Sequence, residues 1–316
     1  MAHLPPGFSS SNDVALDRRY RWAKASLDAG ESDEACEILL QTLAEAPSWA
    51  PAWKLLGDAL AASDKGNEAR GAYERVVELD PLGRLGAKLE LARLGAVKPH
   101  DAMQPGYVAA LFDDYSDRFD AHLVERLGYR APRVMLDALR ETCAVEERAL
   151  RFEHAIDLGC GTGLMGEIIR PFATSLTGVD LSPGMLTKAR AKLVYDHLIR
   201  TDIVEFLRAA PRSGADLILA ADVLVYIADL RPFFAAAATA LCAGGLLAFT
   251  VQSCGDDATR DGFALGLDNR FAHSQAYLRE AATSQALDVV HLKSAVTRQD
   301  AGRDVAGFAA VLARTQ

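Results

Sequence analysis

The chain has 316 residues, of which 50% are hydrophobic, and a formal net charge of −9. This length exceeds what a single hydrophobic core usually organises, so two domains are expected. The acidic balance argues against a nucleic-acid-binding surface, and no stretch of the sequence reaches the ~18 apolar residues of a membrane span. We therefore expect neither nucleic acid nor a membrane among the partners.

The amino-terminal residues and the cysteines bear on the compartment. Residues 1–13 are rich in Pro and Ser, lack the basic start and apolar run of a signal peptide, and are expected to be mobile. The five cysteines are odd in number and lack the paired spacing of metal sites. We expect reduced thiols in a cytoplasmic protein, and we interpret Cys160 as a small space-filling residue rather than a nucleophile.

Residues 14–97 contain an internal repeat with an offset of 34 residues. The second copy is Trp53, Leu56, Gly57, Leu60, Ala69, Tyr73, Val76 and Pro81. The first copy is Arg19, Trp22, Ala23, Ser26, Ala35, Leu39, Thr42 and Pro47. Small residues stand where two paired helices would approach closely, and each proline would end the second helix of its pair. The second copy resembles the tetratricopeptide consensus closely and the first copy loosely.

This resemblance implies an all-helical domain, with a further amphipathic helix over 85–94 capping the stack. Two roles remain open for it. The repeats would form a docking groove for a protein or peptide, or they would be a structural appendage or a contact within a homodimer. The side chains that line such grooves are polar and variable, so the sequence does not identify a ligand.

A linker over 95–105 contains Lys98, Pro99 and His100 and indicates a domain boundary, so the second domain is expected over 105–316. Aromatic residues at 112, 115 and 119 then follow helical spacing, with acidic residues between them. A further helix is expected over 129–139, before the first strand.

The stretch AIDLGCGTG, residues 155–163, joins an apolar strand to a glycine-rich turn and a helix. Gly159, Gly161 and Gly163 carry no Cβ where the backbone must turn sharply and a ligand must come close. Asp157 precedes the turn at a buried position, where an ionised carboxylate needs hydrogen bonds. We expect Asp157 to orient the turn and, through it, a cationic group of a ligand.

Two classes of nucleotide-binding enzyme share a turn of this kind. The order acidic–apolar–Gly-x-Gly-x-Gly resembles motif I of class I S-adenosylmethionine-dependent methyltransferases. Gly161, Gly163 and Gly166 also satisfy the G-x-G-x-x-G pattern of dinucleotide-binding folds. Asp157 favours the methyltransferase, because a carboxylate beneath a pyrophosphate would be repelled. An NAD(P)-dependent oxidoreductase is the alternative enzyme, and a non-catalytic S-adenosylmethionine-binding scaffold is the non-enzymatic alternative.

From residue 155 on, short apolar strands alternate with helices, which predicts a doubly wound parallel sheet. Asp180 ends the second strand, where a carboxylate accepts hydrogen bonds from the ribose of an adenosine ligand in both classes. The sequence DLSPGML from Asp180 resembles methyltransferase motif II. The resemblance implies cofactor contacts from Leu181 and Met185, and core packing is the alternative for Met185.

Acidic residues also follow the third and fourth strands. The resemblance implies that Asp202 accepts the adenine amino group beside the amide of Ile203, and Asp202 is equally a good N-cap for the helix over 203–208. Asp222 occupies the place of motif IV at the tip of the fourth strand. Tyr226 would face the sulfonium or the methyl acceptor, or simply pack as a half-exposed aromatic residue.

The carboxyl-terminal part contains the fifth strand over 246–251, a polar segment over 256–268 on the expected substrate side, and strands near 287–292 and 305–312. The last two strands are expected as the antiparallel pair that ends the sheet. His273 is the best candidate for a substrate contact, with hydrogen bonding at the start of the following helix as the alternative.

Together these features predict a Rossmann-like seven-stranded methyltransferase sheet with an amino-terminal all-α tetratricopeptide-like domain. The resemblance implies S-adenosylmethionine as cofactor and a small-molecule or protein methyl acceptor. It also implies lid helices over 105–140, with the helix over 112–120 folding over the cofactor and Tyr115 in contact with it. Packing of its aromatic residues into the core is the alternative.

Methyl transfer of this kind needs an acceptor lone pair in line with the methyl–sulfur bond, so positioning supplies most of the acceleration. A hydroxyl or acid acceptor would also use a general base, and Asp222, Tyr226 and His273 are the candidates. The sequence contains no metal-ligand cluster, and no metal is expected.

Overall fold

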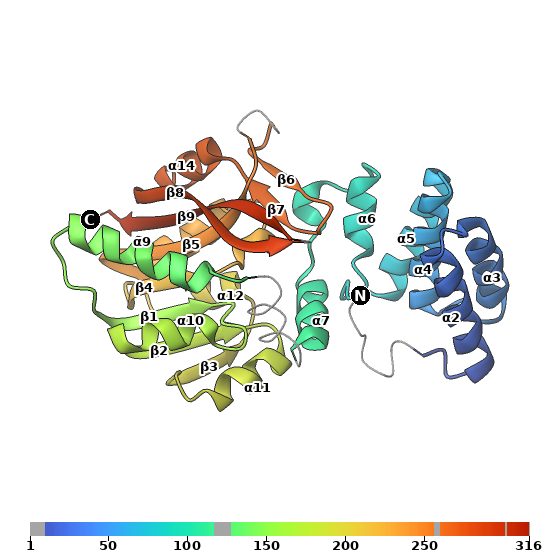
Figure 1. Ribbon diagram of the computed structural model, residues 1–316, viewed down its shortest axis with the longest axis horizontal. Helices are drawn as coiled ribbons and strands as arrows, with labels where there is room; N and C mark the ends of the chain where they lie inside the picture. The colour runs from blue at the N-terminus through green and yellow to red at the C-terminus, as the bar shows by residue number, and fades with distance from the viewer. Residues whose placement is uncertain (1–9, 117–127, 256–259, 301, 316) are drawn as a thin grey trace. The chain divides into compact units, whose positions relative to one another are not determined.

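The computed structural model describes four stretches of the chain: residues 10–116, 128–255, 260–300 and 302–315. The chain divides into two compact units, residues 1–114 and 115–316. The first unit is helical and the second is built on a mixed sheet (Figure 1).

Consecutive helices pack against one another in the first unit, and their short connections follow from polar and glycine residues between the apolar stretches. Asp13 begins the first helix by accepting hydrogen bonds from the amides of Ala15 and Leu16. Pro51 lies in the first turn of another helix, where its missing N–H is not needed. The helices are α2 (Val14–Asp28), α3 (Ser32–Glu45), α4 (Ala50–Ala62), α5 (Gly66–Leu79) and α6 (Ala87–Arg93).

The small residues of the repeat lie at close contacts between helices. Ala23, Ala35 and Ala69 are fully buried. A Cβ on Gly57 of α4 would come within 2.4 Å of the Tyr73 ring of α5. The helices thus lie where the repeat predicted them, while their assignment to the tetratricopeptide family stays a prediction.

The boundary between the units differs from the expected one at residue 105, since α7 (Pro105–Tyr115) belongs to the first unit as far as Asp114. The start of α7 packs closely against the backbone of the first unit, since a Cβ on Gly106 would lie 2.0 Å from the carbonyl oxygen of Leu82. The predicted lid helix over 112–120 is described only as far as Ser116, so its role as a lid stays a prediction.

The described part of the second unit contains nine strands, two more than expected. Five parallel strands follow the order β3-β2-β1-β4-β5, and β9 continues the sheet antiparallel to β5 and to β8. The closing antiparallel pair is thereby confirmed. The strands are β1 (Phe152–Leu158), β2 (Ala173–Asp180), β3 (His197–Arg200), β4 (Ala215–Ala220), β5 (Leu241–Ser253), β6 (Phe263–Leu265), β7 (Phe271–His273), β8 (Leu287–Asp300) and β9 (Arg303–Arg314).

The two additional strands form a short antiparallel hairpin, β6–β7, and β7 pairs with the last two residues of β5. Each has only three residues, which is too short for an alternating pattern to identify. The hairpin occupies part of the segment that we had expected to be an irregular substrate-side loop.

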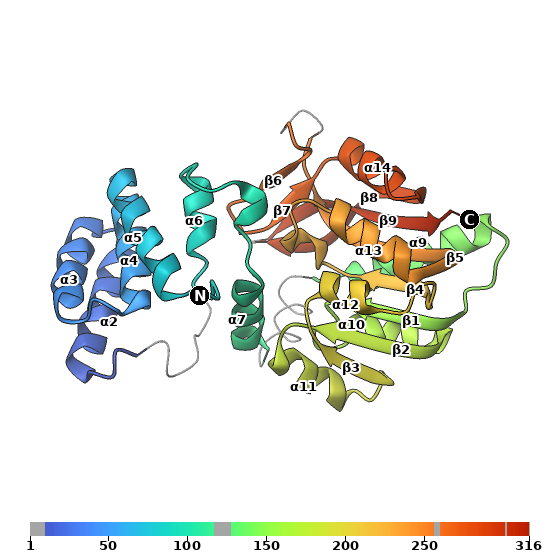
Figure 2. The same cartoon turned by 180° about the vertical axis from the view of Figure 1, so that it is seen from behind.

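Helices cover both faces of the sheet, as Figures 1 and 2 show from opposite sides. Met135 and Leu139 of α9 pack with Leu217 and Leu219 of β4 on one face. On the other face, the ring of Phe234 in α13 lies 5.6 Å from that of Phe249 in β5. The helices of this unit are α9 (Ala131–Val145), α10 (Leu164–Ile169), α11 (Pro183–Ala191), α12 (Ile203–Ala209), α13 (Arg231–Ala240) and α14 (Gln275–Thr283).

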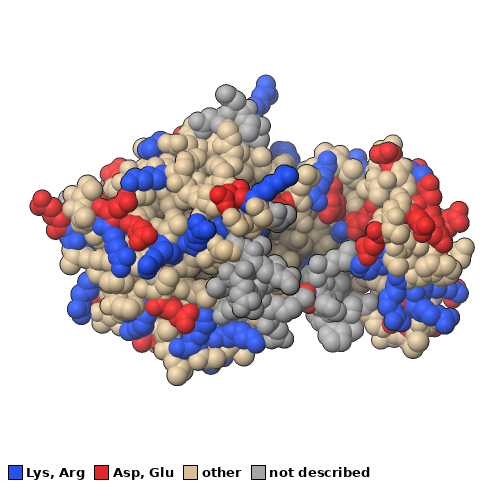
Figure 3. All heavy atoms as spheres, in the orientation of Figure 1, with Lys and Arg blue, Asp and Glu red and all other residues tan. Residues whose placement is uncertain are grey.

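Acidic and basic side chains are intermixed over the face of the second unit drawn in Figure 3. Within the described ranges, the helices are too short or too polar to cross a bilayer.

Candidate functional site

The glycine turn follows the carboxyl end of β1 and leads into α10. Gly159, Gly161 and Gly163 all have positive φ angles, of 61°, 54° and 94°. A Cβ on Gly159 would also lie 2.3 Å from a methyl carbon of Val223. The turn therefore requires glycine both for its backbone conformation and for its close approach to the loop after β4.

Asp180, at the end of β2, holds this turn from the neighbouring strand. Its Oδ2 accepts a hydrogen bond of 2.9 Å from the amide of Gly161, and its Oδ1 accepts one of 2.8 Å from the amide of Ser182. Ser182 in turn caps α11 by accepting from the amide of Met185. Met185 is fully buried, which fits the core-packing interpretation, and Leu181 is only half-buried.

Asp157 lies one strand away in a buried position, with 1% of its surface exposed. Its Oδ2 accepts a 2.6 Å hydrogen bond from the Tyr195 hydroxyl, whereas its Oδ1 is buried with no hydrogen-bond partner among the described residues. Burial raises the pKa of the carboxyl to about 7, the Tyr195 hydrogen bond opposes the rise, and Asp180 adds to it. A buried, half-satisfied carboxylate of this kind fits a cationic or hydrogen-donating ligand group.

The sequence analysis missed Tyr195, which lies between α11 and β3. Its ring fills the space beside the turn, since a Cβ on Gly166 would lie 2.4 Å from its hydroxyl oxygen and one on Gly178 would lie 3.0 Å from its Cδ1. Gly166 is inside a helix and Gly178 inside a strand, where a glycine indicates a close neighbour. That was the available signal, although it does not identify the neighbour.

Asp202 follows β3 and begins α12. Its Oδ1 accepts hydrogen bonds of 2.8 Å and 3.1 Å from the amides of Val204 and Glu205, which confirms the predicted N-cap. Ile203, the first residue of the helix, is buried. The adenine contacts expected of both residues stay predictions.

The three acidic residues share one edge of the sheet. Asp157 pairs in register with Gly178 of β2, and Asp180 pairs with Arg200 of β3, two residues before Asp202. Because these strands are parallel neighbours, their carboxyl ends lie together beside the glycine turn.

Asp222 follows β4 on the other side of the turn. Both of its carboxylate oxygens accept from Nη1 of Arg298, at 3.0 Å and 3.2 Å, and its amide donates to Thr250 Oγ1. Its φ of 57° is uncommon for a residue with a side chain and is held by these contacts. Arg298 of β8 is 1% exposed and was missed by the sequence analysis, because 76 residues separate it from Asp222.

Tyr226 ends the short helix η4 (Leu224–Tyr226) and belongs to the same polar group. Its hydroxyl accepts from Nε of Arg270 at 3.3 Å, and burial raises its pKa above the usual value. Asp268 joins the two arginines, since its Oδ2 lies 3.7 Å from Arg270 Nη1 and 3.5 Å from Arg298 Nη2. Asp222, Tyr226, Asp268, Arg270 and Arg298 are called the acceptor-side cluster below.

His273 requires a correction, because the structure places it in the core and not at a surface that a substrate reaches. It is the last residue of β7 and is fully buried. Its Nε2 lies 3.0 Å from the carbonyl oxygen of Ala228, its ring stacks on Tyr277, and burial lowers its pKa to about 4. The three-residue strand, which the sequence did not reveal, is what buries it. Ser274 caps α14 as expected.

Tyr115, expected to contact the cofactor, is the last residue of α7. The segment after residue 116 lies outside the described residues. The contact of Tyr115 with a cofactor therefore stays a prediction.

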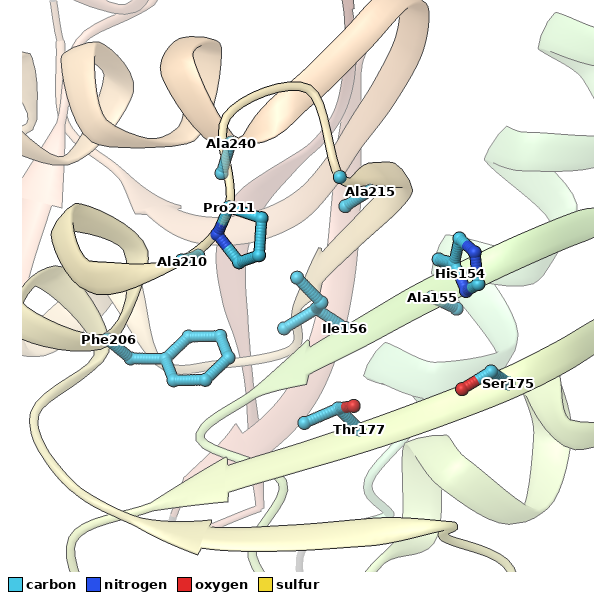
Figure 4. Close-up of a pocket in the computed structure, with 11 residues that line it drawn as sticks. His154, Ala155, Ile156, Ser175, Thr177, Phe206, Ala210, Pro211, Ala215 and Ala240 are labelled. Carbon is cyan, nitrogen blue, oxygen red and sulfur yellow. The ribbon is translucent and has the colours of Figure 1, made fainter.

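A separate hollow lies over the amino-terminal halves of β1 and β2 (Figure 4). Ile156 and Thr177 face it from the strands, and Phe206 and Pro211 face it from α12 and the loop that follows. The glycine turn is at the opposite end of β1. This hollow is therefore distinct from the strand ends that carry the three acidic residues.

Comparisons with known proteins match the part of the chain that contains the glycine turn. Residues 156–247 match the family model described as a methyltransferase domain. Trans-aconitate 2-methyltransferase of Klebsiella pneumoniae is 36% identical over 102 residues, which are 31% of this chain and 39% of that protein. Malonyl-[acyl-carrier protein] O-methyltransferase of Salmonella typhimurium is 30% identical over 139 residues, which are 43% of this chain and 53% of that protein.

A crystal structure of a 1,6-didemethyltoxoflavin-N1-methyltransferase from Burkholderia thailandensis aligns with 70% of this chain and 92% of its own, at a TM-score of 0.49 and 16% identity. The chain spans about half, or less, of the length of the curated relatives it matches. Residues 156–247, which contain the glycine turn and the acidic strand ends, are thus the part of the chain that is similar to methyltransferase domains.

Proposed function

We propose that this protein transfers a methyl group from S-adenosylmethionine, bound over the glycine turn, to a small-molecule acceptor. The observation that carries the proposal is the buried Oδ1 of Asp157, which has no partner among the described residues and lies beside a turn that contains three glycines with positive φ angles. The cofactor supplies a methyl carbon made electrophilic by a sulfonium, together with an ammonium group that a carboxylate at this turn can orient. The names of the two curated relatives, one for trans-aconitate and one for malonyl-[acyl-carrier protein], support a small or carrier-bound acceptor.

The neighbouring acidic residues are suited to the adenosyl part. The oxygens of Asp180 accept from the backbone amides of Gly161 and Ser182, and a carboxylate can accept about four hydrogen bonds, so it can also accept from a ribose hydroxyl. Asp202 uses Oδ1 for both capping bonds, which leaves Oδ2 for an adenine amino group. The amide of Ile203 is in the first turn of α12, where N–H groups have no helical partner and can donate to a ring nitrogen.

Isothermal titration with S-adenosylhomocysteine and with NAD tests the proposal. We expect S-adenosylhomocysteine to bind, and Asp180→Ala to weaken binding by at least about tenfold through loss of charge-assisted hydrogen bonds. Asp288→Ala, which changes an exposed acidic residue of β8, is the matched control and should bind like the natural protein. Tight NAD binding without S-adenosylhomocysteine binding would contradict the proposal and support the oxidoreductase alternative.

We further propose that the first unit is tetratricopeptide-like and docks an acidic segment of a protein partner. The support comes from α2, where Val14 and Trp22 are 81% and 60% exposed. Arg18 and Arg21 are exposed on the same helix, and basic side chains gather over this region on the face drawn in Figure 3. Two exposed apolar side chains with basic neighbours are complementary to an acidic segment that carries apolar side chains.

Charge reversal tests this docking without disturbing the core. The double substitution Arg18→Glu with Arg21→Glu should abolish capture of the partner from an extract and leave S-adenosylhomocysteine affinity unchanged. Arg70→Glu with Arg75→Glu, at an exposed and a half-buried position of α5, is the control. Equal capture by both variants would rule out α2 as the docking face.

A further inference from the structure

The residues that the sequence nominated as general bases are all engaged elsewhere in the structure. Both oxygens of Asp222 accept from Arg298, and Arg298 itself is buried. Burial raises the pKa of the Tyr226 phenol above its ordinary value of 10.0, which further disfavours the deprotonated form that a base requires. His273 is enclosed in the core against Ala228. The acceptor-side cluster is thus suited to a nucleophile that arrives already deprotonated.

Within the described residues, the cluster also has hydrogen-bond donors to spare. A guanidinium has five N–H donors, and Arg270 uses Nε for Tyr226 at 3.3 Å and directs Nη1 at Asp268 across a longer 3.7 Å. Asp268, by contrast, already accepts from Gln252 at 2.9 Å and from Arg298. Arg270 is 24% exposed, against 1% for Arg298, so its spare donors are the ones that a ligand can reach.

Arg270 is joined to the glycine turn by a short series of contacts. Val223 lies against Gly159, and Tyr226, three residues later, accepts the hydrogen bond from Arg270. The guanidinium carbon of Arg270 lies 5.9 Å from the centre of the Tyr226 ring, within the range of a cation–π contact, which adds a second contact to the Nε hydrogen bond. A planar guanidinium held in this way matches the two oxygens of a carboxylate.

We propose that the methyl acceptor is a carboxylic acid whose anion is bound by Arg270, and that the product is a methyl ester. The inference rests on the proposed methyltransferase function and specifies its substrate class. A carboxylate oxygen forms the new bond to the methyl carbon, the methyl–sulfur bond breaks, and its electron pair stays on sulfur. No proton moves, so the reaction needs no general base. The neutral S-adenosylhomocysteine and the uncharged ester then leave.

The chemistry of the product tests this even while the acceptor is unidentified, because mild base releases methanol from methyl esters but not from methyl ethers, amines or C-methyl groups. The full chain is incubated with methyl-labelled S-adenosylmethionine and a cell extract. Labelled methanol is then measured after base treatment of the small-molecule and the protein fractions separately. We expect base-released methanol, and the fraction in which it appears distinguishes a free acid from a protein carboxylate.

Two variants assign the effect to Arg270. Arg270→Gln should lower ester formation at least about tenfold by removing charged hydrogen bonds, and Arg270→Lys should retain part of it. Arg279→Gln, at an exposed position of α14, should have no effect. S-adenosylhomocysteine affinity should be unchanged in all three, which reports an intact fold and cofactor site.

Binding of acids gives a second measurement that needs no turnover. Small mono- and dicarboxylates, each paired with its amide, are titrated into the protein saturated with S-adenosylhomocysteine. We expect acids to bind more tightly than their amides, and this preference to be lost in Arg270→Gln. Base-stable label, ester formation unaffected by Arg270→Gln, or no preference for acids over amides would each overturn the carboxylate proposal. Failure of S-adenosylhomocysteine to bind at all would instead overturn the proposed function itself.

Discussion

The hydroxyl of Tyr195 donates a 2.6 Å hydrogen bond to Asp157, the buried carboxylate in front of the glycine turn. The bond supports the ionised form of a group whose pKa burial raises to about 7. If Asp157 orients the cofactor as proposed, Tyr195 acts through it as a positioning residue. This relationship makes the charge state of the site adjustable by a side chain that would not itself touch the cofactor.

Tyr195→Phe removes the donor and keeps the ring. The pKa of Asp157 should rise further, because this hydrogen bond is what opposes the effect of burial. A cationic cofactor group prefers ionised Asp157, so S-adenosylhomocysteine affinity should rise with pH up to about 7 in the natural protein and level off above it. In the variant the rise should extend to higher pH. Titration calorimetry between about pH 5.5 and 8.5 measures this, and identical profiles would contradict the assignment.

Asp157→Asn should remove that pH dependence and weaken cofactor binding at neutral pH. It should also change stability in a predictable direction. The folded-state pKa of about 7 lies above the ordinary value of 3.8, so the folded state binds more protons between these values. The contribution of Asp157 to stability is therefore greatest at low pH and is lost as pH rises from about 4 to 7. Between about pH 5 and 8, the melting temperature of the natural protein should fall more than that of the variant.

Features set by neighbouring residues in the chain were predictable from the sequence. Asp157, Asp180 and Asp202 end consecutive parallel strands, and the parallel sheet alone brings them to one edge. Capping by Asp202 and Ser274 was equally readable, because it depends on the three residues that follow. The order of residues along the chain therefore identified the glycine turn and the strand ends where we propose that the cofactor binds.

Contacts between distant segments were not predictable. Tyr195 reaches Asp157 across 38 positions, and Arg298 reaches Asp222 across 76. Neither Tyr195 nor Arg298 belongs to a recognisable sequence motif. A tyrosine in a loop and an arginine in a strand are common, and only the fold shows which carboxylate each one contacts. His273 was misjudged for a related reason. A histidine just before a helix N-cap suggests a surface position, and only the unrecognised strand β7 shows that it is buried.

Two glycine substitutions in the first unit test its helix packing as a matched pair. Gly57→Ala would place a methyl group 2.4 Å from the Tyr73 ring, so it should destabilise the unit. Overpacking of this kind costs about 1–3 kcal/mol. Gly71→Ala in α5 has no atom within 4 Å of the new methyl group and should stabilise the helix. The gain is at most about 1 kcal/mol, the difference in helix propensity. Chemical denaturation of each variant measures both, and equal stabilities would contradict the close contact between α4 and α5.

The buried pair of Asp222 and Arg298 provides the final prediction. Arg298→Met should destabilise the protein by about 3–5 kcal/mol, because it leaves a carboxylate that is 13% exposed without its cation. Adding Asp222→Asn should recover much of that loss, since an amide at this position needs no counter-charge. The double-mutant cycle, measured by denaturant unfolding, should therefore give a coupling energy of at least about 1 kcal/mol. Arg303→Met, on an exposed residue of β9, should change stability by less than about 0.5 kcal/mol and serves as the control. Additive effects of the two substitutions would show that the ion pair does not hold the tip of β4, and the strained backbone of Asp222 would then need another cause.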